Sequence, residues 1–70
     1  MIRATMYPRD GSEVYLGAFP DVAACVAECL RRGLRRIDIV SIVTPVDTET
    51  GQPVPIADII AELLKTEVSR

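Results

Sequence analysis

Apolar and polar residues alternate in two short stretches at the start of the chain, residues 2–7 and 13–18, and a turn rich in proline, aspartate and glycine separates them. Strict alternation is typical of strands with one buried face. The two stretches therefore predict a β-hairpin. The register that pairs Ala4 with Leu16 brings the apolar side chains together, whereas a slip of one residue would turn every side chain to the other face.

Two longer stretches repeat apolar residues at helical spacing. The first runs from Pro20 to Leu30, and Gly33 follows it as a stop signal. The second begins at Pro55, and its apolar stripe consists of Ile56, Ile59, Ile60, Leu63, Leu64 and Val68. Both patterns predict amphipathic helices with one face toward a core.

Between these helices lies the longest β-branched run of the chain, residues 36–44. β-Branched residues favour strands, and Gly33 and Pro45 punctuate the two ends of the run. Both faces of such a strand are largely apolar. We therefore expect either a central strand covered on both sides or a strand that offers Val40 and Ile42 to a partner. Residues 46–54 follow as a hairpin-like excursion, which its prolines confine to a sheet edge.

These elements predict an α+β fold in the order ββαβ(β)α. We expect one small domain over residues 1–70, with a mostly antiparallel sheet of three to four strands and two helices. The simplest sheet order places the first strand in the middle, antiparallel to both neighbours, and a grasp-like order with a parallel pair is the alternative. The last helix either joins the first helix or covers the opposite face of the sheet.

Composition narrows the class of protein. The chain carries 10 acidic and 8 basic residues, and this net charge of −2 is too mild to indicate a nucleic-acid binder. We expect neither a signal peptide nor a membrane-spanning segment, since the sequence contains no apolar run of the length that either requires. Cys25 and Cys29 lie four residues apart in a helical pattern, a spacing that suits a disulfide poorly. We expect a cytoplasmic protein with reduced thiols and no membrane association.

The sequence contains no constellation of residues that is typical of catalysis. It has no histidine, its serines have no base beside them in a known motif, and its cysteines fall on an apolar helix stripe, where a thiol stays protonated. It also has no metal-ligand spacing and no glycine-rich phosphate loop. We therefore expect a non-enzymatic protein that uses neither a metal nor a cofactor.

Charged residues gather in two regions. The basic patch consists of Arg31, Arg32, Arg35 and Arg36. These arginines either complement the end of the first helix and pair with Glu28, or bind nucleic acid or an acidic protein surface. The C-terminal half is acidic, and its candidate partner-binding residues are Asp47, Glu49, Asp58 and Glu62. They either form an ordinary polar exterior or imitate phosphates toward a basic channel.

Two tyrosines fall on the polar face of the predicted hairpin. Tyr7 and Tyr15 become diagonal neighbours there, and tyrosine is favoured at interfaces. Together with Val40 and Ile42, they define a candidate strand face for partner binding. The alternative is that the tyrosines pack beneath the last helix.

Residues 17–25, GAFPDVAAC, resemble the strand-end segment of HicB-type antitoxins, although helix-forming residues replace the small-residue turn of that family. In size, mild acidity and absence of catalytic motifs, the whole chain resembles the small phage-type anti-CRISPR proteins. This second resemblance implies a non-enzymatic inhibitor or regulator that blocks a DNA-binding surface of a nucleoprotein complex. The alternatives are an antitoxin-like, nucleic-acid-binding module that uses the basic patch, and a structural domain that self-associates as a homodimer.

Overall fold

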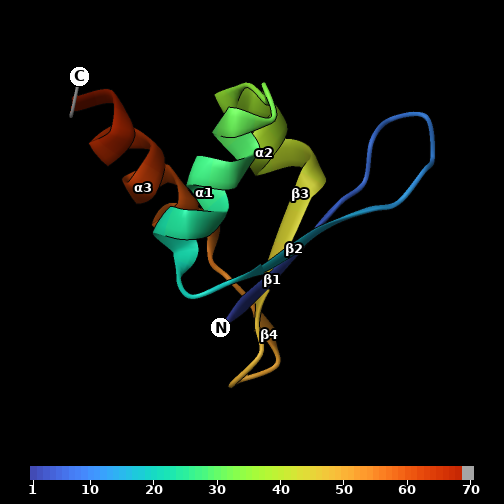
Figure 1. Cartoon of the computed structure of the whole chain (residues 1–70), viewed down its shortest axis with the longest axis horizontal. Helices are drawn as coiled ribbons and strands as arrows, with labels where there is room; N and C mark the ends of the chain where they lie inside the picture. Colours follow the sequence, from blue (N-terminus) through green and yellow to red (C-terminus); the bar gives the residue numbers. More distant parts are fainter. Residues whose placement is uncertain (69–70) are drawn as a thin grey trace.

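The computed structural model describes residues 1–68. Its elements are β1 (Ile2–Met6), β2 (Val14–Phe19), α1 (Val22–Arg31), α2 (Arg36–Ile42), β3 (Val43–Asp47), β4 (Gln52–Pro53) and α3 (Ile56–Val68), as Figure 1 shows. The strands form one antiparallel sheet in the order β2-β1-β3-β4. The α+β class and the position of the first strand inside the sheet are confirmed, but the described residues form three helices where two were expected.

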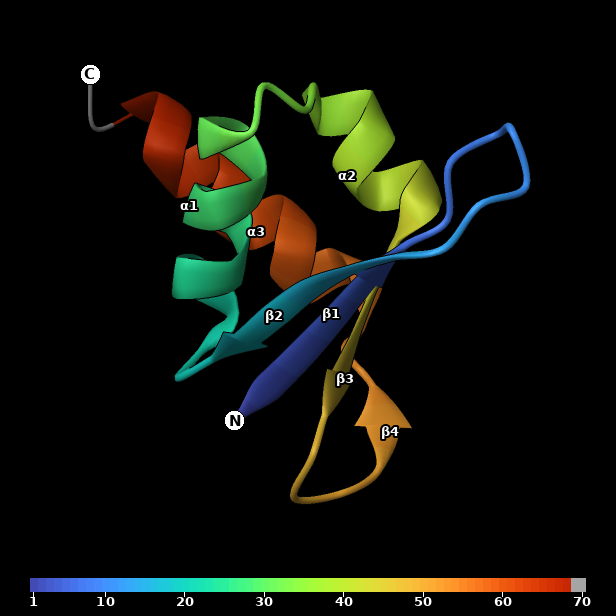
Figure 2. The same cartoon turned by 45° about the vertical axis from the view of Figure 1, so that its right-hand side comes forward.

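All three helices lie on one side of the sheet, as the views in Figures 1 and 2 agree. Helix α1 contacts β1 and β2, α2 contacts β3, and α3 packs against α1 and α2. The last helix therefore joins the first, which resolves the choice that the sequence left open. The core between helices and sheet consists of Ile2, Ala4, Leu16, Cys25, Val26, Cys29, Ile39, Val43, Val54, Ile59 and Leu63.

The hairpin of β1 and β2 keeps the predicted register near its turn and departs from it further along. The predicted pairing of Ala4 with Leu16 is wrong, because a β-bulge at Leu16 shifts the register and Ala4 faces Gly17 instead. Gly17 has a φ of 128°, a conformation that residues with a Cβ atom rarely adopt, so glycine permits the bulge. Beyond the bulge, Phe19 packs against the core and Ala18 is exposed.

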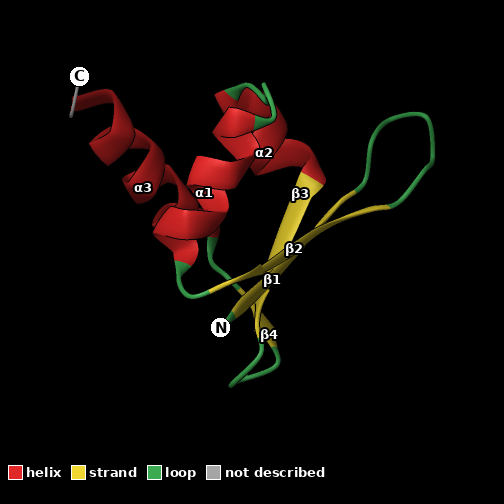
Figure 3. Ribbon diagram, in the orientation of Figure 1, coloured by secondary structure: helices red, strands yellow, loops and turns green. Residues whose placement is uncertain are grey.

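The predicted central strand over residues 36–44 is wrong. Helix α2 occupies most of this segment, and β3 begins only at Val43, as the colours of Figure 3 make plain. The chain leaves the direction of α1 at Gly33, which has a φ of 84° and follows the end of that helix. The backbone N–H of Leu34 then donates to the carbonyl of Cys29 at 3.1 Å, which closes the end of α1 and frees the next residues to start a new helix.

Helix α2 begins with half of a capping box. Arg35 has the extended conformation of an N-cap, and its backbone N–H donates to the carboxylate of Asp38 at 3.1 Å. The helix then buries Ile39 and leaves Ile37 exposed, although a strand would place both on one face. The cap and the burial of Ile39 outweigh the β-propensity of the segment, since helix propensities of ordinary residues span only about 0.7 kcal/mol.

The remaining elements agree with the sequence pattern. Helices α1 and α3 begin close to the predicted starts. The expected excursion over residues 46–54 contains the end of β3, a turn and the short edge strand β4, and the N–H of Val54 donates to the carbonyl of Pro45 at 2.9 Å. The side chain of Val68, expected to extend the apolar stripe of α3, lies outside the part of the chain that the structure describes.

Candidate functional site

A hollow of about 470 Å³ opens between α2 and α3. Three of its aliphatic side chains are largely exposed: Ile37 at 58%, Ile60 at 44% and Leu64 at 52%. Adjacent exposed aliphatic residues from two helices form an apolar patch, which is typical of a binding surface on a small domain. We call this site the α2–α3 groove, and it is lined by Arg35, Arg36, Ile37, Val40, Ile60, Leu63 and Leu64.

The groove exists because each helix has more apolar surface than the core covers. In α3, Ile59 and Leu63 are buried, while Ile60 and Leu64 follow them by one residue and remain exposed. In α2, Ile39 is buried and Ile37 is exposed. The helical spacing predicts the whole α3 stripe to face the core. The pattern of that stripe is the ordinary one of a helix with one buried face, so it gives no signal for a second apolar surface.

The predicted strand face is not assembled. Tyr7 and Tyr15 are exposed beside the hairpin loop that projects from the sheet in Figure 1, so their packing beneath the last helix is also wrong. Val40 and Ile42 belong to α2 and therefore cannot share a strand face with the tyrosines. Val40 instead lines the α2–α3 groove, and Ile42 packs against the core.

The structure brings some of the acidic candidate residues for partner binding close to one another. Asp47 and Asp58 line one small hollow beside β4, and Asp58 and Glu62 line a second hollow on α3. Glu49 lies on the exposed turn between β3 and β4, where its backbone N–H donates to the Asp47 carboxylate at 2.9 Å. Within residues 1–68, no cluster of three or more potential metal ligands of the His, Cys, Asp or Glu type occurs.

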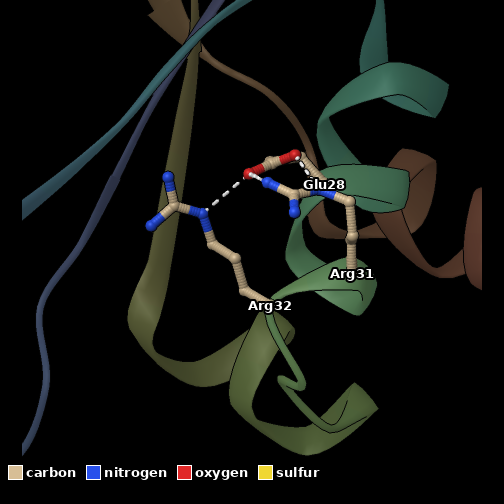
Figure 4. A network of polar contacts seen from close by, with 3 residues as sticks. All are labelled: Glu28, Arg31 and Arg32. Atoms are coloured by element: carbon tan, nitrogen blue, oxygen red, sulfur yellow. Dashed lines mark hydrogen bonds and ion pairs between the residues drawn. The ribbon is translucent and has the colours of Figure 1, made fainter.

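Three arginines of the basic patch form ion pairs with two carboxylates. Glu28 accepts from Arg31 at 2.6 Å and from Arg32 at 2.9 Å, the network drawn in Figure 4. Arg35 approaches Asp38 at 3.4 Å. Hydrogen bonds from Arg31 and Arg32 lower the pKa of Glu28 to about 2. Helix-end pairing with Glu28, one of the two interpretations of the arginines, therefore has a geometric basis.

This pKa shift predicts a pH dependence of stability. A carboxylate with a depressed pKa in the folded state stabilises the fold above its unfolded pKa and loses that contribution as the pH falls toward its folded pKa. For Glu28 the window runs from the ordinary value of 4.5 down to about 2. We expect Glu28→Gln to flatten the fall of the unfolding free energy across this window, measured by urea unfolding at several pH values.

Glu49→Gln is the matched control, because it removes a carboxylate from a turn rather than from the arginine network. In this variant, the unfolding free energy should fall between pH 4.5 and 2 with a slope close to that of the wild type. A Glu28→Gln slope equal to that of the wild type would contradict a stabilising network at the end of α1.

Both cysteines belong to the buried core of the domain. Cys25 and Cys29 are both free and buried, in agreement with the expectation of core thiols. The neighbouring Cys29 thiol and burial both raise the pKa of Cys25, so this thiol remains protonated at neutral pH.

No helix within residues 1–68 combines the length and hydropathy that crossing a bilayer requires. Comparison of the chain with protein-family models, with curated proteins and with solved structures finds no match, which leaves the residues and their geometry as the guide to function.

Proposed function

We propose that this chain is a non-enzymatic protein-binding domain that regulates a larger complex, and that a partner protein docks in the α2–α3 groove. The observation that carries this proposal is the meeting of exposed Ile37, Ile60 and Leu64 in one hollow. Covering apolar surface contributes about 25 cal/mol per Å², and buried aliphatic anchors in a pocket supply much of the affinity at protein interfaces.

The chemistry of the remaining surface supports a role in binding rather than in catalysis. The chain contains no histidine, and both of its thiols are buried. The exposed polar groups of the α1–α2 region pair with one another, as Glu28 does with two arginines. Such pairs suit the rim of an interface, where exposed charges contribute specificity more than affinity.

Two matched substitutions on α3 test the proposal. Leu64 and Ile56 are similarly exposed, at 52% and 57%, but only Leu64 lines the groove. We expect the wild type and Ile56→Lys to retain the same protein from an extract of the cells in which the chain occurs. We expect Leu64→Lys to lose that protein, because a lysine ammonium would be brought into an apolar contact. Circular dichroism of both variants checks that the fold is intact.

Retention of the same protein by all three chains would remove the groove as the docking site. That outcome would favour a second candidate function, an inhibitor that competes with nucleic acid through its acidic surface. The observation behind this candidate is the grouping of Asp58 with Asp47 in one hollow and with Glu62 in the next. Leu64→Lys leaves these carboxylates in place, so the two candidates give opposite results in one experiment.

A further inference from the structure

Within residues 1–68, no helix covers the second face of the sheet, because all three helices lie on the other side (Figures 1 and 2). Strand β1 buries Ile2 and Ala4 against the helices and therefore turns Arg3 and Thr5 away from them. Residues that pair across antiparallel strands share a face. We call this surface the open face, and its residues are Arg3, Thr5, Tyr15, Ala18, Thr44 and Val46.

The open face carries little charge for a surface that no helix covers. Arg3 is the one charged residue among the six, although 26% of the residues in the chain are charged. Tyr15 is 59% exposed on this face. Few charges around an exposed tyrosine are typical of the centre of a protein interface.

A nucleic acid is a poor occupant of the open face. Its affinity depends on the neutralisation of several phosphates, and Arg3 supplies a single positive charge. The sheet edge is also a poor site for an added strand, because the bulge at Leu16 interrupts the regular ladder of β2. The occupant therefore lies over the face and complements its few charges.

Opposite charges lie at the two ends of the open face. Arg3 precedes Thr5 by two residues, and Thr5 pairs with Tyr15. Glu13 precedes Tyr15 by two residues and continues the alternation of β2. Because the strands are antiparallel, Arg3 and Glu13 lie on opposite sides of this pair, each about 7 Å along the sheet. Both are exposed, and neither forms an ion pair with another described residue.

This arrangement of charges is self-complementary. A two-fold axis that crosses the strands at the Thr5–Tyr15 pair reverses the strand direction in a second copy of the chain. Arg3 of each copy then lies opposite Glu13 of the other copy, and the uncharged residues meet between them. Two Arg3–Glu13 ion pairs form in this contact, so a second copy is the occupant that the charges of the open face favour.

We infer that the open face is the contact surface of a weak two-fold dimer of this chain, in which the two sheets pack face to face. The inference goes beyond the proposed function and is independent of it, because none of these residues lines the α2–α3 groove. Strand spacings give the open face an area of about 300 Å² per copy, below the ~800 Å² of a standard interface. The dimer therefore forms at protein concentrations of roughly 0.1–1 mM.

Charge reversal tests the inference in the full chain, by sedimentation equilibrium at low ionic strength from about 10 μM to about 1 mM. The wild type should approach the mass of a dimer at the highest concentration. Arg3→Glu alone and Glu13→Arg alone should each weaken association at least about tenfold, because like charges then face each other. An equimolar mixture of the two variants should associate again, because each supplies the charges that the other lacks.

Asp58→Arg is the matched control, because it makes the same change of charge as Glu13→Arg but on α3, so it should dimerise as the wild type does. A wild type that stays monomeric at about 1 mM overturns the inference, and so does a mixture that fails to associate. A dimer that Leu64→Lys disrupts and Arg3→Glu does not would assign self-association to the groove and overturns it as well. Arg3→Glu leaves the groove intact, so the capture experiment with Leu64→Lys tests the proposed function separately.

Discussion

Replacing Ile39 with alanine should remove a large fraction of the free energy of unfolding of this domain. Ile39 is only 1% exposed and is the buried anchor of α2. Buried Ile→Ala changes cost roughly 2–5 kcal/mol, and the whole stability of a small domain is about 5–15 kcal/mol. We expect a loss of about 3 kcal/mol, which corresponds to a fall in Tm of roughly 12–24 °C. Urea and thermal unfolding followed by circular dichroism measure both quantities.

The control for this substitution is Ile37→Ala in the same helix. Ile37 faces the groove, so its truncation should change the free energy of unfolding by no more than about 0.5 kcal/mol. The comparison separates the two conformations of this segment. In a strand, Ile37 and Ile39 would share a face, and the two alanine substitutions would lower the free energy of unfolding by similar amounts. Such equal losses would contradict a helix over Arg36–Ile42.

Enlarging Ala4 to leucine should give the second large effect. Ala4 is fully buried in β1, between the sheet and the helices, and it faces Gly17 on one side and Pro45 on the other. Added methylene groups in a close-packed interior force side chains and backbone apart, at about 1–3 kcal/mol. We expect a loss of about 2 kcal/mol in the free energy of unfolding, measured by urea unfolding.

Thr5→Leu is the matched substitution on the opposite face of β1. Thr5 pairs with Tyr15 and Thr44, and it follows the buried Ala4, so its side chain lies on the other face of the strand. Thr5 is half-buried and lies outside the core between sheet and helices, so a leucine there should change the free energy of unfolding by no more than about 0.5 kcal/mol. Equal losses for Ala4→Leu and Thr5→Leu would show that both faces of β1 are covered, against the one-sided arrangement of the helices.

The sequence predicts most of this fold because its signals there are local and agree with one another. Alternation marks β1 and β2, and helical spacing marks α1 and α3. Pro53 keeps β4 short and at the edge of the sheet. The register error has a local cause too. Gly17 permits a bulge, but no pattern of apolar residues distinguishes a regular strand from one with an extra residue.

The segment from Arg36 to Ile42 could not be assigned from propensity, because its residues carry two patterns at once. Ile37 and Ile39 alternate as in a strand, while Ile39, Ile42 and Val43 follow the spacing of a helix. Asp38, three residues after the N-cap, was the available sign of a helix start. Contact with α3 and the core decides between the patterns, and tertiary contacts are not readable from a single sequence.

The candidate site was missed for the same reason. Once residues 36–44 are treated as a strand, Val40 and Ile42 are assigned to a sheet face and no second wall exists for the groove. The exposed Ile60 and Leu64 then look like ordinary core residues of α3. The charged residues were easier to find, because Glu28 and its two arginines are neighbours within one helix and its cap.

Docking in the α2–α3 groove requires that its first wall is helical, and NMR chemical shifts test this requirement most directly. In the isotope-labelled chain, the Cα shifts should lie downfield of their random-coil values from Arg36 to Ile42 and upfield from Val43 to Asp47. Upfield Cα shifts that continue from Arg36 through Thr44 would mean an extended segment, and the groove would then not exist.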